Sequence, residues 1–134
     1  MTKKEKITQT ALQLIVNQGI QETPMSQISK VSGVAMGTIY HHFKSKNEII
    51  NQIYLDVKKE FGASIMKDVD KKMEYKARFY QIWKNIFNFF YQHELMFRFS
   101  QHFGHLPIIT ETTRQEGLVF YEPVIDFLAE GIQL

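Results

Sequence analysis

The chain has 134 residues, of which 44% are hydrophobic and 22% charged, and its formal net charge is +2. This length and apolar content suffice to bury the core of one folding unit or of two small ones. The sequence contains no cysteine, which excludes disulfides and thiolate metal sites and fits a reducing cytoplasm. It has no apolar run of about 18 residues and no signal-peptide pattern, so we expect a cytoplasmic protein without a membrane segment.

The first predicted helix lies at the N-terminus. Thr2 and Glu5 have the spacing of a capping box, in which each side chain bonds the backbone N–H group of the other residue. Apolar residues then recur at helical spacing as far as Ile15, and Gly19 is expected to end the helix. We expect this helix to bury its apolar face against the segment that follows.

Residues 24–43 predict two short helices joined by a turn. Thr23 is expected to cap the first of them and Pro24 to be its first residue, because the N–H group that proline lacks would be unpaired there. Gly33 can adopt the left-handed conformation that ends this helix. A second helix is expected over Met36 to Phe43. Two short helices linked by a glycine-containing turn form a helix-turn-helix.

The second of these helices has a polar exposed face. At about 100° per residue, Ile39 and Phe43 point together, whereas Gly37 and His41 point the opposite way. A helix of about eight residues is roughly 12 Å long and fits a DNA major groove about 12 Å wide. Thr38 and His41 can then reach base edges or phosphates, while Gly37 lets the backbone approach closely. The alternative is a surface helix that binds nothing.

The distribution of charge favours DNA binding. Residues 1–46 contain six lysines and two glutamates, a net charge of +4, whereas the other 88 residues hold ten basic and twelve acidic groups, a net charge of −2. Binding of phosphates by lysine and arginine requires such a local excess of positive charge. We therefore expect residues 1–46 to form a DNA-binding domain and residues 47–134 to form a regulatory domain.

Helical periodicity continues to the C-terminus, and no strand pattern is present. Ser45 and Glu48 form a second capping box, which opens a helix that joins the two domains. The chain is therefore predicted to be all-α. Three more helices are expected, which begin at Tyr75, at Glu94 and at about Thr110.

One segment resembles a known family. Residues 33–48 read GVAMGTIYHHFKSKNE and are similar to the signature of the TetR family, whose usual form is AGVSKGTLYHYFKSKEE. The match is specific because it fixes residue types across the turn, the second helix and the start of the next. The resemblance implies a dimeric, ligand-responsive transcriptional regulator, usually a repressor. It also implies a three-helix N-terminal DNA-binding domain followed by a helical ligand-binding and dimerisation domain.

Two residues depart from the family pattern. Ala35 stands where the family usually has serine, so the second helix loses a side-chain cap. Met36 stands where members often have lysine, so a charge that could meet a phosphate is lost. We assign the contacts with double-stranded DNA to Ser26, Met36, Gly37, Thr38, Tyr40, His41 and Lys46.

The second half of the chain is rich in aromatic residues, which is typical of a small-molecule pocket. Aromatic residues at helical spacing also form close-packed cores, and this alternative stays open. A small hydrophobic, aromatic or cationic effector would fit such a pocket. We assign its lining to Trp83, Phe87, Phe90, Tyr91, Phe103 and Tyr121.

Metal binding and catalysis find little support in the sequence. His93, His102 and His105 could in principle hold a metal ion, but Gly104 and Pro107 disturb the helical spacing that would bring them together. We assign no metal site and no cofactor. The sequence has no phosphate-binding loop and no nucleophile elbow, and its carboxylates are scattered, so we expect no enzymatic activity.

The end of the chain is apolar. Pro123 is expected to kink or interrupt the last helix and Gly131 to end it. The resemblance implies two further helices that build the dimer interface, so we expect the sequence to be a fragment or a natural truncation. An uncovered apolar surface is typical of an interface, so we expect the chain either to dimerise through the exposed surface of this last helix or to be unable to pair normally. The residues expected to form it are Val124, Phe127, Leu128, Ile132 and Leu134.

Together these features predict a sequence-specific DNA-binding transcriptional regulator. We expect a repressor that a small hydrophobic or aromatic ligand releases from a palindromic operator. A homodimer would place two DNA-binding domains on half-sites about 34 Å apart, and the effector would change their separation through the connecting helix. The alternative is a helical module that binds a small molecule or a partner without binding DNA.

Overall fold

The computed structural model describes residues 1–133, and every regular element in that range is helical, which confirms the predicted all-α fold. Leu134, which was expected to belong to the apolar end, lies outside the described residues. No helix within residues 1–133 combines the length and apolar character needed to cross a bilayer. In chain order the elements are α1 (Lys3–Gln18), α2 (Met25–Ser32), α3 (Met36–His42), α4 (Lys46–Ile65), α5 (Tyr75–Gln92), α6 (Glu94–Phe103), α7 (Glu111–Leu118), the 3-10 turn η1 (Val119–Tyr121) and α8 (Glu122–Gln133).

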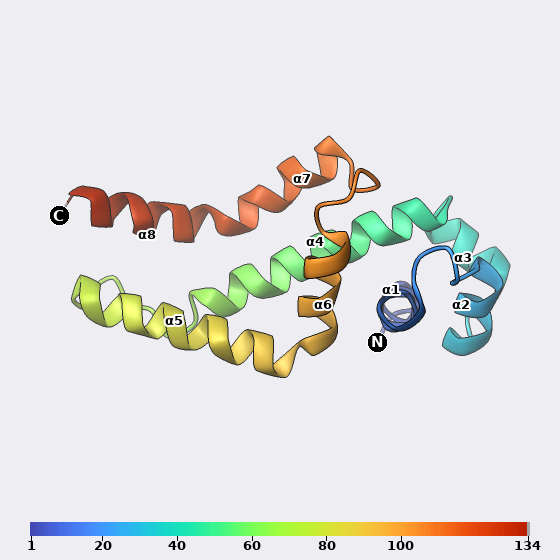
Figure 1. Cartoon of the computed structure of the whole chain (residues 1–134), viewed down its shortest axis with the longest axis horizontal. Coiled ribbons are helices and arrows are strands. Elements are labelled where there is room, and N and C mark those ends of the chain that lie inside the picture. Colours follow the sequence, from blue (N-terminus) through green and yellow to red (C-terminus); the bar gives the residue numbers. More distant parts are fainter. Residues whose placement is uncertain (134) are drawn as a thin grey trace.

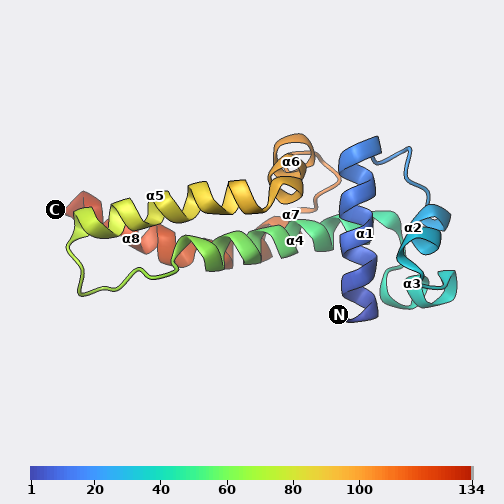
Figure 2. The same cartoon turned by 90° about the horizontal axis from the view of Figure 1, so that it is seen from below.

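The molecule is elongated, and its N-terminal helices lie at one end. Figure 1 and Figure 2 show α2 and α3 beside α1 at that end, and α4 running from them into the body. Helix α5 returns along α4, and α6 brings the chain back beside α1. Helices α7 and α8 then lead to the far end, where the C-terminus lies. Helix α4 therefore connects the two ends of the molecule.

Two groups of buried side chains stabilise this arrangement. The larger group joins α1, α2 and α3 to α4 and includes Ile7, Ile28, Ile39 and Ile50, which are all fully buried. Phe99 of α6 belongs to the same group and is 1% exposed. The packing is thus continuous across residue 46, and α4 shares one core with α1, α2 and α3. The smaller group lies at the far end and contains Ile65, Ile82 and Phe127.

Most of the predicted helix ends are found. The Thr2 hydroxyl accepts a hydrogen bond from the N–H group of Glu5 at 3.1 Å, and the Glu5 carboxylate accepts one from the N–H group of Thr2 at 3.2 Å. Gly19 and Gly33 follow α1 and α2 with φ values of 99° and 73°, which L side chains rarely adopt. The Ser45 hydroxyl accepts a bond from Glu48 and caps α4.

The start of α2 differs from the prediction. Thr23 is not its cap, because the Thr23 side chain is fully buried and its hydroxyl donates to the Gly19 carbonyl at 2.7 Å. Pro24 takes the N-cap position with an extended backbone, and the helix begins at Met25 without a side-chain cap. The Thr23 hydroxyl closes the loop between α1 and α2 instead of capping α2. A local capping pattern in the sequence does not reveal this role.

The C-terminal segment follows one prediction and departs from another. The expected interruption before Pro123 is found, because η1 separates α7 from α8 and α8 begins at Glu122. Gly131 does not end the last helix, which continues to Gln133. A Cβ atom at Gly131 would collide with the hydroxyl group of Tyr75, the end of a side chain whose ring stacks on Phe127 of the same helix.

Candidate nucleic-acid interface and ligand pocket

The turn between α2 and α3 is fixed by short polar contacts. The Ser29 hydroxyl donates to the carbonyl of Val34 at 2.6 Å, and the N–H group of Val34 donates to the Ser32 hydroxyl at 3.2 Å. Ile28 and Ile39 bury the inner faces of the two helices completely. The orientation of α3 is therefore set by both its core and its turn.

Helix α3 presents the face that the sequence predicted. Gly37, Tyr40 and His41 are exposed, and a Cβ atom added at Gly37 would have no atom within 4 Å. Thr38 and Met36 are half-buried on the same short helix, while Ile39 is fully buried beneath it. The structure thus brings these five predicted contact residues together on one helix.

Two further residues of the predicted set lie outside α3. Ser26 is exposed in the first turn of α2. Lys46 is half-buried at the start of α4, and its ammonium group donates to the carbonyls of Ile20 and Thr23 at 2.6 and 3.2 Å. This side chain therefore ties α4 to the loop between α1 and α2.

Gln18 is a positioning residue that the sequence did not indicate. Its side-chain amide donates to the Glu22 carbonyl at 2.8 Å, to the Thr23 hydroxyl at 3.2 Å and to the Gln27 side chain at 2.6 Å. These contacts join the end of α1 to α2 around the loop that Lys46 also holds. A glutamine at a helix end has no sequence signature for such a role.

Helix α3 lacks a side-chain cap, as the presence of Ala35 predicted. Ala35 has the extended backbone of an N-cap, with φ of −60° and ψ of 146°, but no side chain bonds the first N–H groups of the helix. Serine or threonine at this position would supply that bond.

The structure does not gather the six predicted ligand residues around one cavity. Trp83, Phe87 and Tyr91 are 57%, 72% and 83% exposed on the outer face of α5. Phe103 packs against the larger core group instead. The inner face of α5 is formed by other apolar residues, among them Ile82 and Phe89. Aromatic residues occupy both faces of this helix, so periodicity did not identify the inward one.

Phe90 and Tyr121 do line a common cavity. It has a volume of about 250 Å³ and lies between α4, α5, α6 and η1. Phe61 of α4 lies beside both residues, with ring centroids 5.6 Å from that of Phe90 and 5.7 Å from that of Tyr121. The complete lining is Val57, Lys58, Phe61, Phe89, Phe90, Phe97, Ser100, Gln101 and Tyr121.

Two glycines allow the wall of this cavity to form. A Cβ atom at Gly62 of α4 would lie 2.5 Å from the carbonyl oxygen of Phe120 in η1. A Cβ atom at Gly117 of α7 would lie 3.2 Å from the Tyr54 ring and 3.3 Å from the side chain of Lys58. Glycine at these positions lets α7 and η1 lie directly on α4.

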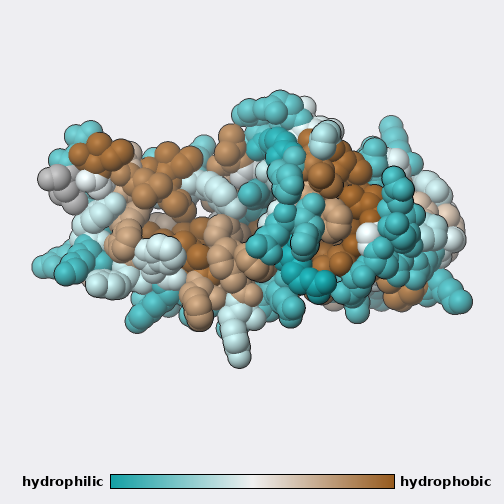
Figure 3. All heavy atoms as spheres, viewed as in Figure 1, coloured by the Kyte–Doolittle hydropathy of each residue, from teal (hydrophilic) through white to brown (hydrophobic). Residues whose placement is uncertain are grey.

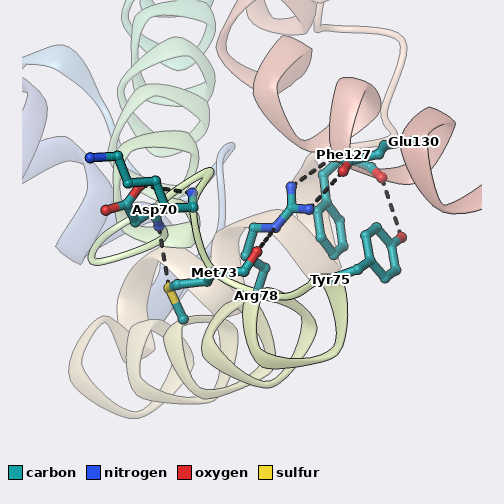
Figure 4. Close-up of polar contacts among 7 residues, drawn as sticks. Asp70, Met73, Tyr75, Arg78, Phe127 and Glu130 are labelled. Carbon is teal, nitrogen blue, oxygen red and sulfur yellow. Dashed lines mark hydrogen bonds and ion pairs between the residues drawn. The ribbon is translucent and has the colours of Figure 1, made fainter.

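The far end of α8 is fastened to α5 by an ion pair. The Arg78 guanidinium donates to both carboxylate oxygens of Glu130 at 2.7 and 2.6 Å, and Figure 4 shows this pair beside Tyr75 and Phe127. The two rings stack with centroids 4.4 Å apart, and the Tyr75 hydroxyl donates to the Phe127 carbonyl at 3.2 Å. Hydrogen bonding to Arg78 lowers the pKa of the Glu130 carboxyl.

The outer face of α8 is apolar. Leu128 and Ile132 are 54% and 85% exposed, as predicted, and Ile125 beside them is 53% exposed. Phe127, which the sequence also placed on this surface, is 5% exposed because it packs against Ile65 and Ile82. Figure 3 shows hydrophobic side chains gathered over this helix, at the end of the molecule away from α1 to α3. A patch of this kind is typical of an interface.

The histidines of the second half do not converge. The ring of His93 stacks on Phe89 with centroids 4.6 Å apart, and the ring of His102 lies against Phe103. Within the part of the chain that the structure describes, no three His, Asp or Glu side chains are placed to hold a metal ion.

Comparison with known proteins agrees with these features. The profile of the bacterial regulatory proteins of the tetR family matches residues 7–53. The crystal structure of a TetR-family transcription regulator from Shewanella sp. PV-4 superimposes with a TM-score of 0.90 at 30% identity, over 99% of this chain and 71% of that one. The chain belongs to the TetR family. This confirms the resemblance, and membership of a family of regulators confirms the prediction of a non-enzymatic protein.

Two other relatives add to the assignment of this TetR-family chain. An uncharacterised helix-turn-helix transcriptional regulator of Haemophilus influenzae is 30% identical over 103 residues, which are 77% of this chain and 55% of the relative. The chain thus spans about half the length of that curated protein. The Bacillus subtilis regulator FadR, solved in complex with stearoyl-CoA, gives a TM-score of 0.78 at 26% identity over 96% of this chain and 70% of that one.

Proposed function

We propose that this TetR-family chain binds double-stranded DNA by inserting α3 into the major groove. The observation that carries the proposal is the exposed polar face of α3, where Gly37, Tyr40 and His41 stand on a helix fixed by its core and turn. The surrounding residues 1–46 have a net charge of +4, which supplies the attraction to phosphates. Thr38, Ser26 and Met36 complete the proposed contact surface.

We further propose that residues 47–134 sense a small-molecule effector. The cavity of about 250 Å³ takes part of its lining from α4, including Val57 and Phe61. The same helix begins at Lys46, which holds the loop between α1 and α2. A ligand that shifts α4 therefore shifts α3 with it, and DNA and ligand oppose each other through linkage. The relative FadR, which was solved with stearoyl-CoA, is a regulator with a bound small molecule.

A homodimer completes the proposed mechanism. One helix-turn-helix reads few bases, so specificity comes from two of them on the half-sites of a palindromic operator, about 34 Å apart. The exposed apolar face of α8, with Ile125, Leu128 and Ile132, is the surface we assign to this pairing. A repressor would occupy the operator without effector and leave it when the effector binds.

The DNA-binding proposal is tested by measuring fluorescence anisotropy with the DNA upstream of the chain's own gene. We expect affinity to fall with increasing salt and His41→Ala to weaken binding about fivefold to a hundredfold. The same substitution at His105, an exposed residue in the connection after α6, serves as the control and is expected to have no effect. Absence of binding at any salt concentration would overturn the proposal and favour a module that does not bind DNA. Binding without salt dependence, or unaffected by His41→Ala, would contradict the assignment of the contact to α3.

A further inference from the structure

The cavity between α4, α5, α6 and η1 contains a cation without a counter-ion. Lys58 lines it, and its ammonium nitrogen lies 4.9 Å from the ring centroid of Tyr121 and 5.2 Å from that of Tyr54. Among residues 1–133 no acceptor within hydrogen-bond distance and no carboxylate within 4.0 Å is found for it. Aromatic faces attract a cation but do not neutralise its charge.

The surroundings of Lys58 do not compensate its positive charge. Burial lowers the pKa of the Lys58 ammonium, and the positive charge of Arg114 lowers it further. The Arg114 guanidinium is itself held by the carbonyls of Gly104 and Leu106 at 3.0 Å each, so it brings a second positive charge without a carboxylate. The half-buried ammonium group has lost part of its hydration, and an anion from outside would replace that hydration with a direct charge-assisted hydrogen bond.

The neutral part of the cavity is suited to an apolar body. Phe61, Phe89 and Phe97 supply aromatic walls, and Ser100 and Gln101 supply polar groups. Burial also raises the pKa of Tyr121 to about 12, so that its hydroxyl stays protonated and can donate a hydrogen bond. The volume of about 250 Å³ lies just below the range of about 300 to 1,000 Å³ typical of pockets for drug-sized ligands. The ligand is therefore small.

We infer that this pocket binds a small carboxylic acid with an aromatic or aliphatic body, and that Lys58 is the counter-ion of its carboxylate. The inference rests on the proposed function and deepens it by assigning the charge of the effector. It replaces the cationic compounds that the aromatic composition alone admitted, because a second cation beside Lys58 and Arg114 would be repelled. Lys58 belongs to α4, so its ligand acts directly on the helix that carries α3.

The test compares three probes that share one apolar body. These are 4-phenylbutanoate, 4-phenylbutan-1-ol and 4-phenylbutan-1-amine, and their binding to the full chain is measured by titration calorimetry. We expect the carboxylate to bind about tenfold or more tighter than the alcohol, and the amine to bind weakest, since a charge-assisted hydrogen bond adds about one to two powers of ten in affinity.

Substitutions of Lys58 test whether this residue causes the preference for the carboxylate over the alcohol. Lys58→Met is expected to remove the advantage of the carboxylate over the alcohol, while Lys58→Arg is expected to retain it. Lys59→Met is the matched control, because Lys59 is the next residue of α4, is exposed and does not line this cavity. The comparison within each protein corrects for any change in fold that the substitution causes.

The outcomes separate this inference from the proposed function. Equal binding of the carboxylate and the alcohol, tighter binding of the amine, or a preference that survives Lys58→Met would overturn the role of Lys58 and leave a neutral pocket. If none of the three probes binds at millimolar concentration, the ligand pocket itself is wrong, although DNA binding by α3 would stand. Release of DNA by 4-phenylbutanoate from wild-type protein but not from Lys58→Met would support both the role of Lys58 and the proposed effector-sensing function.

Discussion

The ammonium group of Lys46 lies 2.6 Å from the carbonyl oxygen of Ile20 and joins the first residue of α4 to the loop that follows α1. The same group also donates to the carbonyl of Thr23 at 3.2 Å. Resemblance to the TetR signature assigned this lysine to DNA, where it would meet a phosphate. The hydrogen bonds of Lys46 within the protein indicate a second role, in which this side chain holds the helix-turn-helix against α4.

Replacing Lys46 with methionine distinguishes these two roles. We expect the free energy of unfolding to fall by about 1 to 2 kcal/mol, because two carbonyls lose a charged donor. The salt dependence of DNA binding is expected to stay the same if Lys46 acts within the protein, and to decrease by about 0.9 in log–log slope if it contacts a phosphate. Urea denaturation and salt titrations of binding measure the two effects.

Lys44→Met is the matched control for Lys46. Lys44 is exposed in the same segment, and its ammonium group has no hydrogen-bond partner among residues 1–133. We expect its replacement to leave the free energy of unfolding unchanged. Equal destabilisation by the two substitutions would contradict the structural role of Lys46.

Gly37→Ala should change stability and DNA binding in opposite directions. Gly37 lies inside α3 and an added methyl group would have no neighbour within 4 Å, so alanine is expected to stabilise the helix by about 0.5 to 1 kcal/mol. The same methyl group would stand between the helix backbone and DNA and weaken binding. Thermal melting and anisotropy on one protein sample measure both. A variant that binds DNA as well as wild type would show that α3 does not approach DNA through Gly37.

Gly62→Ala should disturb the wall of the ligand cavity. The added Cβ atom would lie 2.5 Å from the carbonyl oxygen of Phe120, a backbone atom that cannot rotate away. We expect a loss of about 1 to 3 kcal/mol in the free energy of unfolding, because η1 must move off α4. Ser64→Ala, a substitution two residues further along α4, provides a comparison with no added volume. A neutral Gly62→Ala would mean that η1 does not rest on α4.

Local signals in the sequence were sufficient for most of the fold. The capping box at Thr2, the Ser45 cap of α4 and the left-handed glycine at Gly33 act within a few residues, so their partners are visible in the sequence. The second half of the box predicted at Ser45 does not form, because the Glu48 carboxylate accepts from the N–H group of Lys44 at 2.6 Å in place of that of Ser45. Thr23 was misassigned because its hydroxyl bonds the carbonyl of Gly19, within the loop, in place of the helix that follows. Capping preferences show which side chains can cap a helix. They do not show whether another group, such as the Gly19 carbonyl, binds that side chain first.

The ligand cavity was harder to predict for a different reason. Helix α5 carries aromatic side chains on both faces, and Trp83 and Phe87 lie outside while Phe89 lies inside. Which face is buried depends on the placement of α4 and η1, and that depends on Gly62 and Gly117, whose spacing has no pattern of its own. The roles of Lys46 and Lys58 likewise depend on contacts between distant segments.

The Arg78–Glu130 pair predicts a pH-dependent stability for the attachment of α8. The Arg78 guanidinium lowers the pKa of Glu130 in the folded protein, so the ionised carboxylate favours folding. This contribution is present above the pKa that Glu130 has in the unfolded chain and is lost as the pH falls through its folded-state pKa. We therefore expect Glu130→Gln to lower the Tm at pH 7 and to lower it less as the pH falls below the ordinary pKa of a glutamate.

Thermal melting of wild-type protein and Glu130→Gln between pH 7 and pH 3 measures the contribution directly. Glu116→Gln is a suitable control, because Glu116 is an exposed carboxylate of α7 that forms no ion pair within residues 1–133. The change in Tm caused by Glu116→Gln reports the general effect of removing one negative charge. The change in Tm caused by Glu130→Gln at pH 7 is expected to be larger. A Tm difference for Glu130→Gln that is the same at pH 7 and pH 3 would show that packing of α8 on Tyr75, and not the ion pair with Arg78, holds this end of the molecule.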